Sequence, residues 1–325
     1  MVYGKVVLTA ISIIAFLGNS LTVLLFIKKS ELLKKTYNCL ILALAVQDIL
    51  QAIFIAILPG YILDEDAYTL PPDRTLRWMF CKLFWSQFFI FALGIASVYT
   101  CLMLTFDRWL AVVMPLTFKK YEKSKLVVFS TVLFPWIAGT CFEITAPLRA
   151  TTTQVNGSFS CAWKTPEYSS KTIVIATFTF LGMIVVPGAL MVIAYSRIIV
   201  HMKRSEIRIE VIRNNQRMVR KSNALKALKR VTTTAFFASG IIIVCWLPDQ
   251  LYYALSQVNL TELGTTIHFV FKSLAFANSC INPAIYCFSN RAYRTGLREL
   301  FGCFCCKVHP QGGELSGPGE AVHPS

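Results

Sequence analysis

Seven long stretches of the chain are apolar and contain at most one charged side chain each. The hydrocarbon core of a bilayer is crossed by roughly 20 apolar residues of helix, and each stretch is long enough to do so. Shorter connections of mixed polarity, some of them strongly basic, separate the stretches. The pattern predicts seven transmembrane helices, at about residues 6–27, 38–63, 80–112, 126–148, 171–200, 226–256 and 265–289.

These spans predict an all-α membrane protein. Residues 1–290 form a seven-transmembrane helix bundle in this interpretation. A basic amphipathic stretch at residues 291–302 predicts a short eighth helix lying along the membrane surface. Residues 303–325 are rich in Gly and Pro and are expected to be a disordered cytoplasmic tail.

The composition agrees with a membrane protein. The 325 residues are 55% hydrophobic and only 15% charged, whereas about 25% of residues are charged in an ordinary soluble domain. So much apolar sequence excludes a disordered chain, which lacks the hydrophobic residues to form a core. The net charge is +15, but a basic nucleic-acid-binding protein would be rich in charged residues. We therefore expect no nucleic-acid partner.

The positive charge is confined to alternate connections. The first, third and fifth connections and the tail carry net charges of +3, +3, +9 and +1, and the rest of the chain is close to neutral. Because basic connections stay in the cytoplasm, the N-terminus is expected outside the plasma membrane and the C-terminus inside. The first apolar run is too long for the core of a cleavable signal peptide, so we expect the first span to act as the targeting signal.

The predicted spans contain a set of short motifs in a fixed order. They are Gly18-Asn19 in the first span, Leu44-Ala45 and Asp48 in the second, Asp107-Arg108-Trp109 in the third, Trp136 in the fourth, Pro187 and Tyr195 in the fifth, Cys245-Trp246-Leu247-Pro248 in the sixth, and Asn282-Pro283-Ala284-Ile285-Tyr286 in the seventh. One such motif alone would be weak support. The whole set on the expected spans resembles the rhodopsin-like (class A) G-protein-coupled receptors along essentially the whole chain.

The resemblance implies a receptor rather than an enzyme. An extracellular ligand would move the inner end of the sixth helix outward and so activate a heterotrimeric G protein, with arrestin, a receptor kinase and membrane lipid as further partners. Asp107 would hold Arg108 in the inactive state, and Arg108 would turn toward Tyr195 and Tyr286 on activation. Taken without the resemblance, Asp107 and Arg108 could equally be a pair at the membrane edge. The other switch residues that the resemblance implies are Pro187, Trp246, Pro248, Asn282 and Pro283.

The chain departs from the family pattern in several places. Trp109 replaces the usual Tyr, and Ile242 stands where the sixth span usually has a Phe. The interval from Cys81 to Arg108 is about two residues longer than the family norm. Residues 226–230 contain no acid that could pair with Arg108, which predicts a weakly held inactive state and measurable basal signalling. Few residues precede the first span, which fits either a truncated sequence or a naturally short N-terminus.

An ionisable side chain near the middle of a membrane is costly unless it is paired or hydrated. Asp48 is such a residue, and it could simply be satisfied by neighbouring helices. The resemblance implies instead that it binds a sodium ion, which acts as an allosteric ligand. The implied oxygen ligands are Asn19, Asp48, Ser97, Asn278, Ser279 and Asn282.

Several features suggest modification or cross-linking. Cys81 and Cys161 lie on the expected outer side, where disulfides persist, and we expect them to pair. Asn156-Gly157 is a hairpin-forming dipeptide, and Asn156 and Asn259 each begin a glycosylation sequon. The cysteines that follow the predicted eighth helix are expected palmitoylation sites, since they lack the partner ligands of a zinc site: Cys303, Cys305 and Cys306.

Single residues argue against two receptor subtypes. Amine receptors of this family carry an Asp where this chain has Ile90, and opsins carry their retinal-binding Lys where it has Phe276. A polar outer mouth remains. Within it, Asp249 and Lys272 could neutralise each other, or the acids could receive a basic side chain of a peptide while Lys272 takes a carboxylate or carbonyl. The candidate ligand-binding residues are Gln87, Glu143, Asp249, Gln250, Tyr253, His268 and Lys272.

This mouth, with the predicted hairpin, favours a neuropeptide receptor similar to the galanin, allatostatin and somatostatin-like group. A receptor for a small molecule or a lipid is the alternative. A transporter or channel is a more distant one, since the matched, broken spans of such proteins are not evident. A membrane enzyme would need convergent nucleophiles or metal ligands, and the four His residues are scattered.

Overall fold

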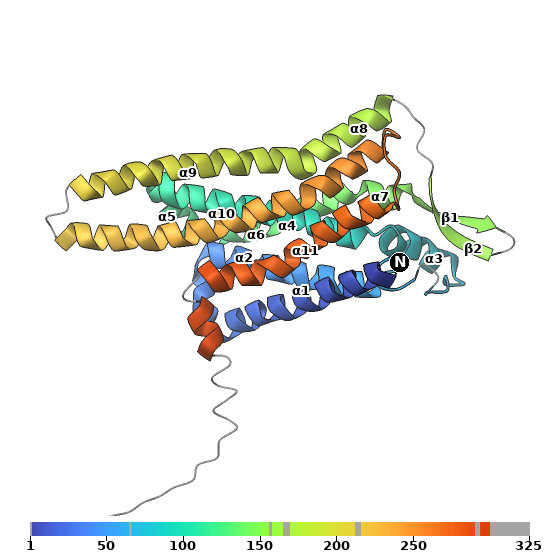
Figure 1. The fold of residues 1–325 in the computed structure, drawn as a ribbon, viewed down its shortest axis with the longest axis horizontal. Helices are drawn as coiled ribbons and strands as arrows, with labels where there is room; N and C mark the ends of the chain where they lie inside the picture. The colour runs from blue at the N-terminus through green and yellow to red at the C-terminus, as the bar shows by residue number, and fades with distance from the viewer. Residues whose placement is uncertain are drawn as a thin grey trace, which may run out of the picture.

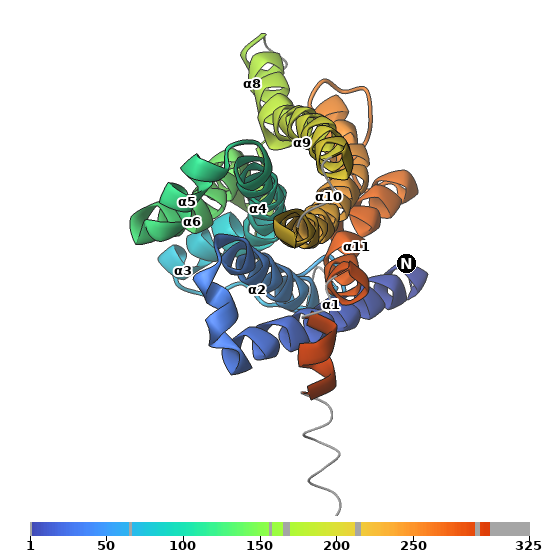
Figure 2. The same cartoon turned by 90° about the vertical axis from the view of Figure 1, so that its left-hand side faces the viewer.

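A computed structural model describes residues 2–64, 67–155, 158–164, 170–211, 216–289 and 293–299. The long helices lie side by side along one direction (Figure 1), and an end-on view shows them arranged as a bundle (Figure 2). The N-terminus and the β-hairpin lie at one end, which we call the outer end. The facing ends of α9 and α10 lie at the opposite end, which we call the inner end.

The chain is helical in almost all of its described length. In the first half the elements are α1 (Val2–Lys28), the 3-10 helix η1 (Ser30–Lys34), α2 (Thr36–Ile57), α3 (Arg74–Met79), the π-helix η2 (Phe80–Trp85), α4 (Phe88–Val113), α5 (Pro115–Lys123), α6 (Lys125–Glu143) and α7 (Thr145–Arg149). In the second half they are β1 (Ala150–Val155), β2 (Ser158–Trp163), α8 (Ser170–Phe180), the π-helix η3 (Leu181–Val185), α9 (Val186–Val211), α10 (Gln216–Ser256) and α11 (Thr266–Ser289).

Six helices of the described chain are long and apolar enough to cross a membrane, namely Tyr3–Lys28, Thr36–Ile57, Arg74–Val113, Lys125–Arg149, Ser170–Ile207 and Leu225–Ser256. The predicted seventh span, α11, has the length but not the apolarity, because it carries polar residues that are buried in the bundle. These include His268, Ser273, Asn278 and Asn282. α11 packs against α1 and α10, so it belongs to the same bundle as the other six.

The predicted second and third spans differ from the helices. α2 ends at Ile57 and not at residue 63, because Leu58 precedes Pro59 and takes the extended backbone that proline imposes on its neighbour. The third span starts further out, at Arg74, and is interrupted. The π-helix η2 precedes Gln87, whose φ of 62° is left-handed, and α4 begins one residue later. Because a π-helix uses more residues per turn, η2 and the break absorb the long interval after Cys81.

The fourth, fifth and sixth spans also differ in detail. α6 ends at Glu143, and α7 continues to Arg149 after the single turn residue Ile144. The fifth span contains the π-helix η3 just before Pro187, which has no N–H to donate to Met183. α9 and α10 run further toward the inner end than predicted, to Val211 and from Gln216. The inner connection between α4 and α6 forms α5, which the apolar pattern does not predict.

The predicted eighth helix is partly described, as residues 293–299 are helical. The other residues of that stretch and the tail from 303 to 325, with Cys303, Cys305 and Cys306, lie outside the described residues. So does Asn156 at the hairpin turn.

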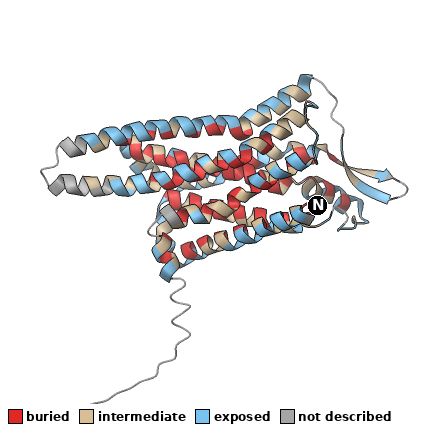
Figure 3. Ribbon diagram, in the orientation of Figure 1, coloured by how far each residue is buried: buried red, intermediate tan, exposed pale blue. Residues whose placement is uncertain are grey.

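The central helix of the bundle is α4, which packs against α2, α6, α9 and α10. Buried residues are concentrated toward the interior of the bundle, and exposed residues lie mostly on its outside (Figure 3). Large apolar residues such as Phe129, Phe178 and Val192 are exposed there. An apolar outer surface of this kind suits contact with lipid, and helices bond most of their backbone groups internally, as a lipid environment requires.

Candidate functional site

A β-hairpin is fixed across the outer end of the bundle. β1 and β2 pair antiparallel, with Thr152 opposite Cys161. Cys161 forms a disulfide with the buried Cys81 of η2, as the sequence predicted. Trp163 of β2 also lies against Trp85 of η2, with 5.0 Å between the ring centroids. The hairpin is therefore anchored to the outer end of the third span by a covalent bond and an aromatic contact.

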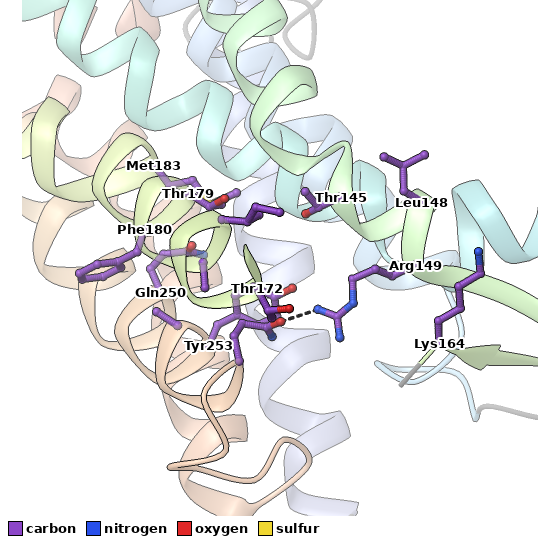
Figure 4. Close-up of a pocket in the computed structure, with 14 residues that line it drawn as sticks. Thr145, Leu148, Arg149, Lys164, Thr172, Thr179, Phe180, Met183, Gln250 and Tyr253 are labelled. Atoms are coloured by element: carbon purple, nitrogen blue, oxygen red, sulfur yellow. Dashed lines mark hydrogen bonds between the residues drawn. The ribbon is translucent and has the colours of Figure 1, made fainter. Parts of the chain in front are cut away.

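A cavity of about 370 Å³ opens near this hairpin, between α7, α8, η3 and α10 (Figure 4). Two of the predicted ligand-binding residues, Gln250 and Tyr253, line it. The others were not predicted, because Arg149 and Lys164 read as loop charges and the rest are uncharged residues without a motif. They are Thr145, Leu148, Arg149, Lys164, Thr172, Ile175, Ala176, Thr179, Phe180, Met183, Ala254 and Gln257.

The wall of this cavity carries two cations, Arg149 and Lys164. The Arg149 Nη1 atom donates a hydrogen bond to Gln257 Oε1 at 2.5 Å, which ties the end of α7 to α10 (Figure 4). The Arg149 Nε atom is buried and has no hydrogen-bond partner in the described chain. None of the described residues that line the cavity is acidic. The wall therefore suits a carbonyl or carboxylate group of a ligand.

A buried acid lies one residue before Gln250 on α10. Asp249 is 1% exposed, its Oδ2 lies 3.5 Å from Gln250 Nε2, and its Oδ1 lies 3.9 Å from His268 Nε2. Oδ1 accepts no hydrogen bond from the described residues. Glu143, at the end of α6, is near enough to interact with Asp249 electrostatically. The two carboxyl groups therefore form an acidic region beside the cavity.

Lys272 of α11 does not form a direct ion pair with Asp249, although it acts on that acid electrostatically. Its Nζ atom instead lies 5.5 Å from the ring centroid of Tyr61 and 5.8 Å from that of Phe91. The Tyr61 hydroxyl donates to Gln87 Oε1 at 2.7 Å. Gln87 and Lys272 therefore both contact Tyr61, and Lys272 brings this contact close to Asp249.

The inner end holds the predicted switch. Arg108 and Asp107 are buried and form an ion pair, with Arg108 Nε 3.0 Å from Asp107 Oδ2. The Arg108 guanidinium lies 4.9 Å from the ring centroid of Tyr37 and 6.0 Å from that of Phe118. Arg108 thus contacts side chains of its own helix, of α2 and of α5. None of the ion pairs among the described residues joins it to α10.

Two tyrosines near this switch differ in their contacts. Tyr121 of α5 donates to Thr131 Oγ1 of α6 at 3.1 Å, and burial raises the pKa of Tyr121 to about 12, so it stays a donor at neutral pH. The Tyr286 hydroxyl is buried without a hydrogen-bond partner in the described part of the protein. A buried hydroxyl without a partner costs free energy. It would therefore gain from bonding to a new partner if the helices move.

The predicted proline and tryptophan positions lie along the helices that would move. Pro187 is the second residue of α9, and Pro248 and Pro283 interrupt the hydrogen bonding of α10 and α11. Trp246 is fully buried, with its ring centroid 6.4 Å from that of Phe91. The indole therefore sits one turn deeper than the acid at Asp249.

The predicted sodium ligands are brought together only in part. Asp48 accepts hydrogen bonds from Ser279 Oγ at 2.9 Å and from Asn282 Nδ2 at 2.8 Å. The Oδ1 atoms of Asn19 and Asn278 are buried without a partner among the described residues. Carboxylate and amide oxygens of this kind are the ligands that a hard cation prefers.

Ser97 is the predicted ligand that points elsewhere. Its hydroxyl lies 3.3 Å from Gln47 Oε1 and 3.0 Å from the Leu93 carbonyl. Gln51 was not predicted, but its Oε1 lies 2.9 Å from the Ser279 hydroxyl.

The family model of the seven-transmembrane receptors of the rhodopsin family matches residues 18–286. The chain belongs to this family of membrane receptors, which are not enzymes.

Three relatives show how similar the chain is to individual receptors. The allatostatin-A receptor of Bombyx mori is 29% identical over 306 residues, which are 90% of this chain and 78% of that receptor. The galanin receptor 2a of Danio rerio is 24% identical over 306 residues, 92% of this chain and 78% of that receptor. The somatostatin receptor type 4 of Rattus norvegicus is 26% identical over 231 residues, 68% of this chain and 55% of that receptor.

Similarity of this degree extends beyond receptors named for peptides. The histamine H2 receptor of Homo sapiens is 26% identical over 313 residues, 93% of this chain and 79% of that receptor. The identity values alone do not separate peptide from amine receptors, so the choice depends on the site.

Proposed function

We propose that this receptor binds an extracellular peptide at its outer end and activates a heterotrimeric G protein at its inner end. The proposal rests on the cavity beside the anchored hairpin. The wall of this cavity is basic, and the region next to it is acidic. A peptide presents carbonyl and carboxylate oxygens together with basic groups. It can therefore satisfy Arg149 and Lys164 on one side and Asp249 and Glu143 on the other.

The site does not favour an amine or a lipid. A small amine needs one buried acid on the third span, but Ile90 is fully buried at that position, and the acids here lie on α6 and α10. A lipid would leave the buried Asp249 and the Nε atom of Arg149 without partners, which costs free energy in a dry site. Polar residues on opposite walls suit a longer ligand with several polar groups.

On the inner side, the proposed change is an outward movement of the inner half of α10. Pro248 interrupts the backbone hydrogen bonds of α10, so the helix can bend there when a ligand contacts the Trp246 region. Moving this half exposes Arg108 and the basic ends of α9 and α10 to the G protein. Arrestin and a receptor kinase would use the same face afterwards, and membrane lipid would contact the basic surroundings.

Two further proposals concern the surroundings of the protein. The plasma membrane is the proposed location, with the N-terminus outside, and the alternation of basic connections supports this. A sodium ion is the proposed allosteric ligand, supported by Asp48 with the free oxygens of Asn19 and Asn278. It would supply a positive charge that keeps Asp48 ionised between α2 and α11.

The ligand is tested by screening a library of neuropeptides against cells that express the receptor with a promiscuous G protein. A peptide should activate the receptor, and Asp249→Asn should then lower its potency at least tenfold. A hydrogen bond to a charged group is worth about 1.5–3 kcal/mol, which corresponds to such a change.

Glu262→Gln is the matched control, because Glu262 is an exposed acid of the last outer connection. It should leave the potency unchanged. Unaltered potency in Asp249→Asn would exclude the acid from the binding site. Activation by an amine or a lipid, with no response to any peptide, would contradict the peptide proposal as a whole.

A further inference from the structure

Three buried hydroxyl groups from three helices meet midway between Trp246 and Arg108. Thr105 lies on α4, Tyr195 on α9 and Ser239 on α10, and all three residues are buried. The Thr105 and Ser239 oxygens are 3.1 Å apart, and the Tyr195 hydroxyl lies 3.3 Å from each of them. We call these three residues the hydroxyl cluster.

The hydroxyl cluster can be fully hydrogen-bonded in one arrangement. Each hydroxyl has a single hydrogen, and the shortest contact, from Thr105 to the Cys101 carbonyl at 2.8 Å, uses the hydrogen of Thr105. Ser239 can then donate to Thr105, and Tyr195 can donate to Ser239. The resulting chain of hydrogen bonds joins α9 to α10 and α10 to α4. Ser239 is its centre, because both of the bonds between helices pass through it.

Among the described residues, few other polar contacts hold the inner half of α10 against α4, and one of them, at 3.4 Å from the Cys101 carbonyl of α4, is again made by the Ser239 hydroxyl. Residues 226–230 contain no acid, and Arg108 is paired with Asp107. The ion pair between Lys229 and Glu206, at 2.8 Å, joins α10 to α9 and not to α4. Its side chains are also 56% and 43% exposed, and exposed ion pairs contribute little. The hydroxyl cluster, in contrast, is buried, where a broken hydrogen bond leaves an unsatisfied polar group.

We infer that Ser239 is a positioning residue which keeps the inner half of α10 packed against α4 while the receptor is inactive. The inference rests on the proposed function, because it assumes that α10 moves outward to admit a G protein. An outward movement separates Ser239 from Thr105 and frees the Tyr195 hydroxyl. In this receptor, neutral hydrogen bonds among α4, α9 and α10 thus take the place of an ion pair between Arg108 and an acid on α10.

The test compares Ser239→Ala with Ser239→Thr in the full-length receptor without ligand. Spin labels are attached through p-acetylphenylalanine at positions 120 and 227, which avoids the native cysteines, and the distance between them is measured in the purified protein. Losing one net hydrogen bond shifts an equilibrium roughly threefold to tenfold. Ser239→Ala should increase the population with the longer distance by that factor, whereas Ser239→Thr keeps the hydroxyl and should resemble the unchanged protein.

Two variants separate this role from a general loss of stability. Thr105→Val removes the partner hydroxyl but leaves Ser239 the Cys101 carbonyl at 3.4 Å, so it should act in the same direction as Ser239→Ala and less strongly. The double variant should resemble Ser239→Ala alone. Thr234→Val is the control, because the partner of its buried hydroxyl among the described residues is the Arg230 carbonyl of the same helix, at 3.1 Å. It should leave the distance distribution unchanged. Tyr195 is left intact, because its hydroxyl is expected to serve the active state as well.

Basal G-protein activation in cells is measured alongside the distances. A parallel rise of both in Ser239→Ala supports the inference and the proposed coupling together. A longer distance with no rise in basal signalling supports the role of Ser239 and counts against the coupling. Equal distance populations in Ser239→Ala, Ser239→Thr and the unchanged receptor would overturn the inference, whatever the signalling assay shows.

Discussion

At the scale of single residues, the contact between α4 and α10 depends on the absence of one side chain. Gly94 lies against the indole of Trp246, and a Cβ atom at this position would overlap the Cζ2 and Cη2 atoms of that ring. Trp246 is fully buried, so it has no free space into which to withdraw. Gly94 therefore determines how closely Trp246 packs against α4. Trp246 is the residue that we expect to link the ligand to the movement of α10.

Gly94→Ala should lower the thermal stability of the purified receptor. Forcing an extra carbon atom into a well-packed interior costs about 1–3 kcal/mol, so the melting temperature should fall by several degrees.

Gly240→Ala is the matched control on α10. No atom lies within 4 Å of the position that its Cβ would take, and alanine favours a helix over glycine by about 0.5–1 kcal/mol. The melting temperature of this variant should stay the same or rise. If Gly94→Ala melted as late as Gly240→Ala, the close packing of α4 against Trp246 would be wrong.

At the scale of elements, the apolar pattern predicted the helices well and their interruptions poorly. Runs such as residues 6–27 are helical because a lipid environment requires internally bonded backbone, whatever the local propensity. The π-helix η2 and the left-handed Gln87 depend on contacts distant in sequence. Gln87 is held by Tyr61, and η2 by the disulfide of Cys81. No local pattern marks such contacts.

The candidate site was predicted unevenly for the same reason. The disulfide follows from two cysteines on the same side of the membrane, and the group around Asp249 follows from unusual polar residues in apolar spans. Arg149 was missed because it reads as a loop charge, and only the continuation of α6 into α7 brings it to Gln257 on α10.

The backbone at Gln87 gives a prediction of its own. Gln87→Gly and Gln87→Ala both lose the hydrogen bond with Tyr61, but only glycine adopts a φ of 62° freely. The glycine variant should therefore be more stable than the alanine variant by about 1 kcal/mol, as measured by thermal unfolding in detergent.

Tyr61→Phe serves as the control for the lost hydrogen bond, since it leaves the backbone of residue 87 unchanged. An alanine variant as stable as the glycine variant would show that residue 87 is not left-handed.

At the scale of the whole molecule, the charge on the connections and the position of the hairpin agree with each other. The hairpin and its disulfide lie at the end opposite the inner ends of α9 and α10 (Figure 1). Those inner ends flank the connection with a net charge of +9. A disulfide requires an oxidising compartment, and a basic connection favours the cytoplasm. Both criteria therefore support the proposed orientation of the bundle.

Glycosylation provides the test of this orientation. Asn259 lies in an exposed turn of the last outer connection, and it begins a sequon as Asn156 does. Treating the expressed receptor with a glycosidase that removes N-linked glycans should increase its mobility on a gel. The double variant with Asn156→Gln and Asn259→Gln should show no such shift.

A sequon created on α5 by Lys120→Asn with Glu122→Thr, in that double variant, should stay unmodified. A glycan on this inner sequon would reverse the proposed topology.

The unequal burial of the helices has a consequence for how such receptors diverge. In the most apolar window of each span, 78% of residues are buried for Arg74–Val113, but only 22% for Lys125–Arg149 and for Ser170–Ile207. A substitution on the third span has to fit its contacts with the neighbouring helices, and few side chains do so. On the fourth and fifth spans most positions need only an apolar side chain, which Leu, Ile, Val and Phe supply equally. Relatives that share only 24–29% of aligned residues with this chain can therefore still match it over 90% or more of its length.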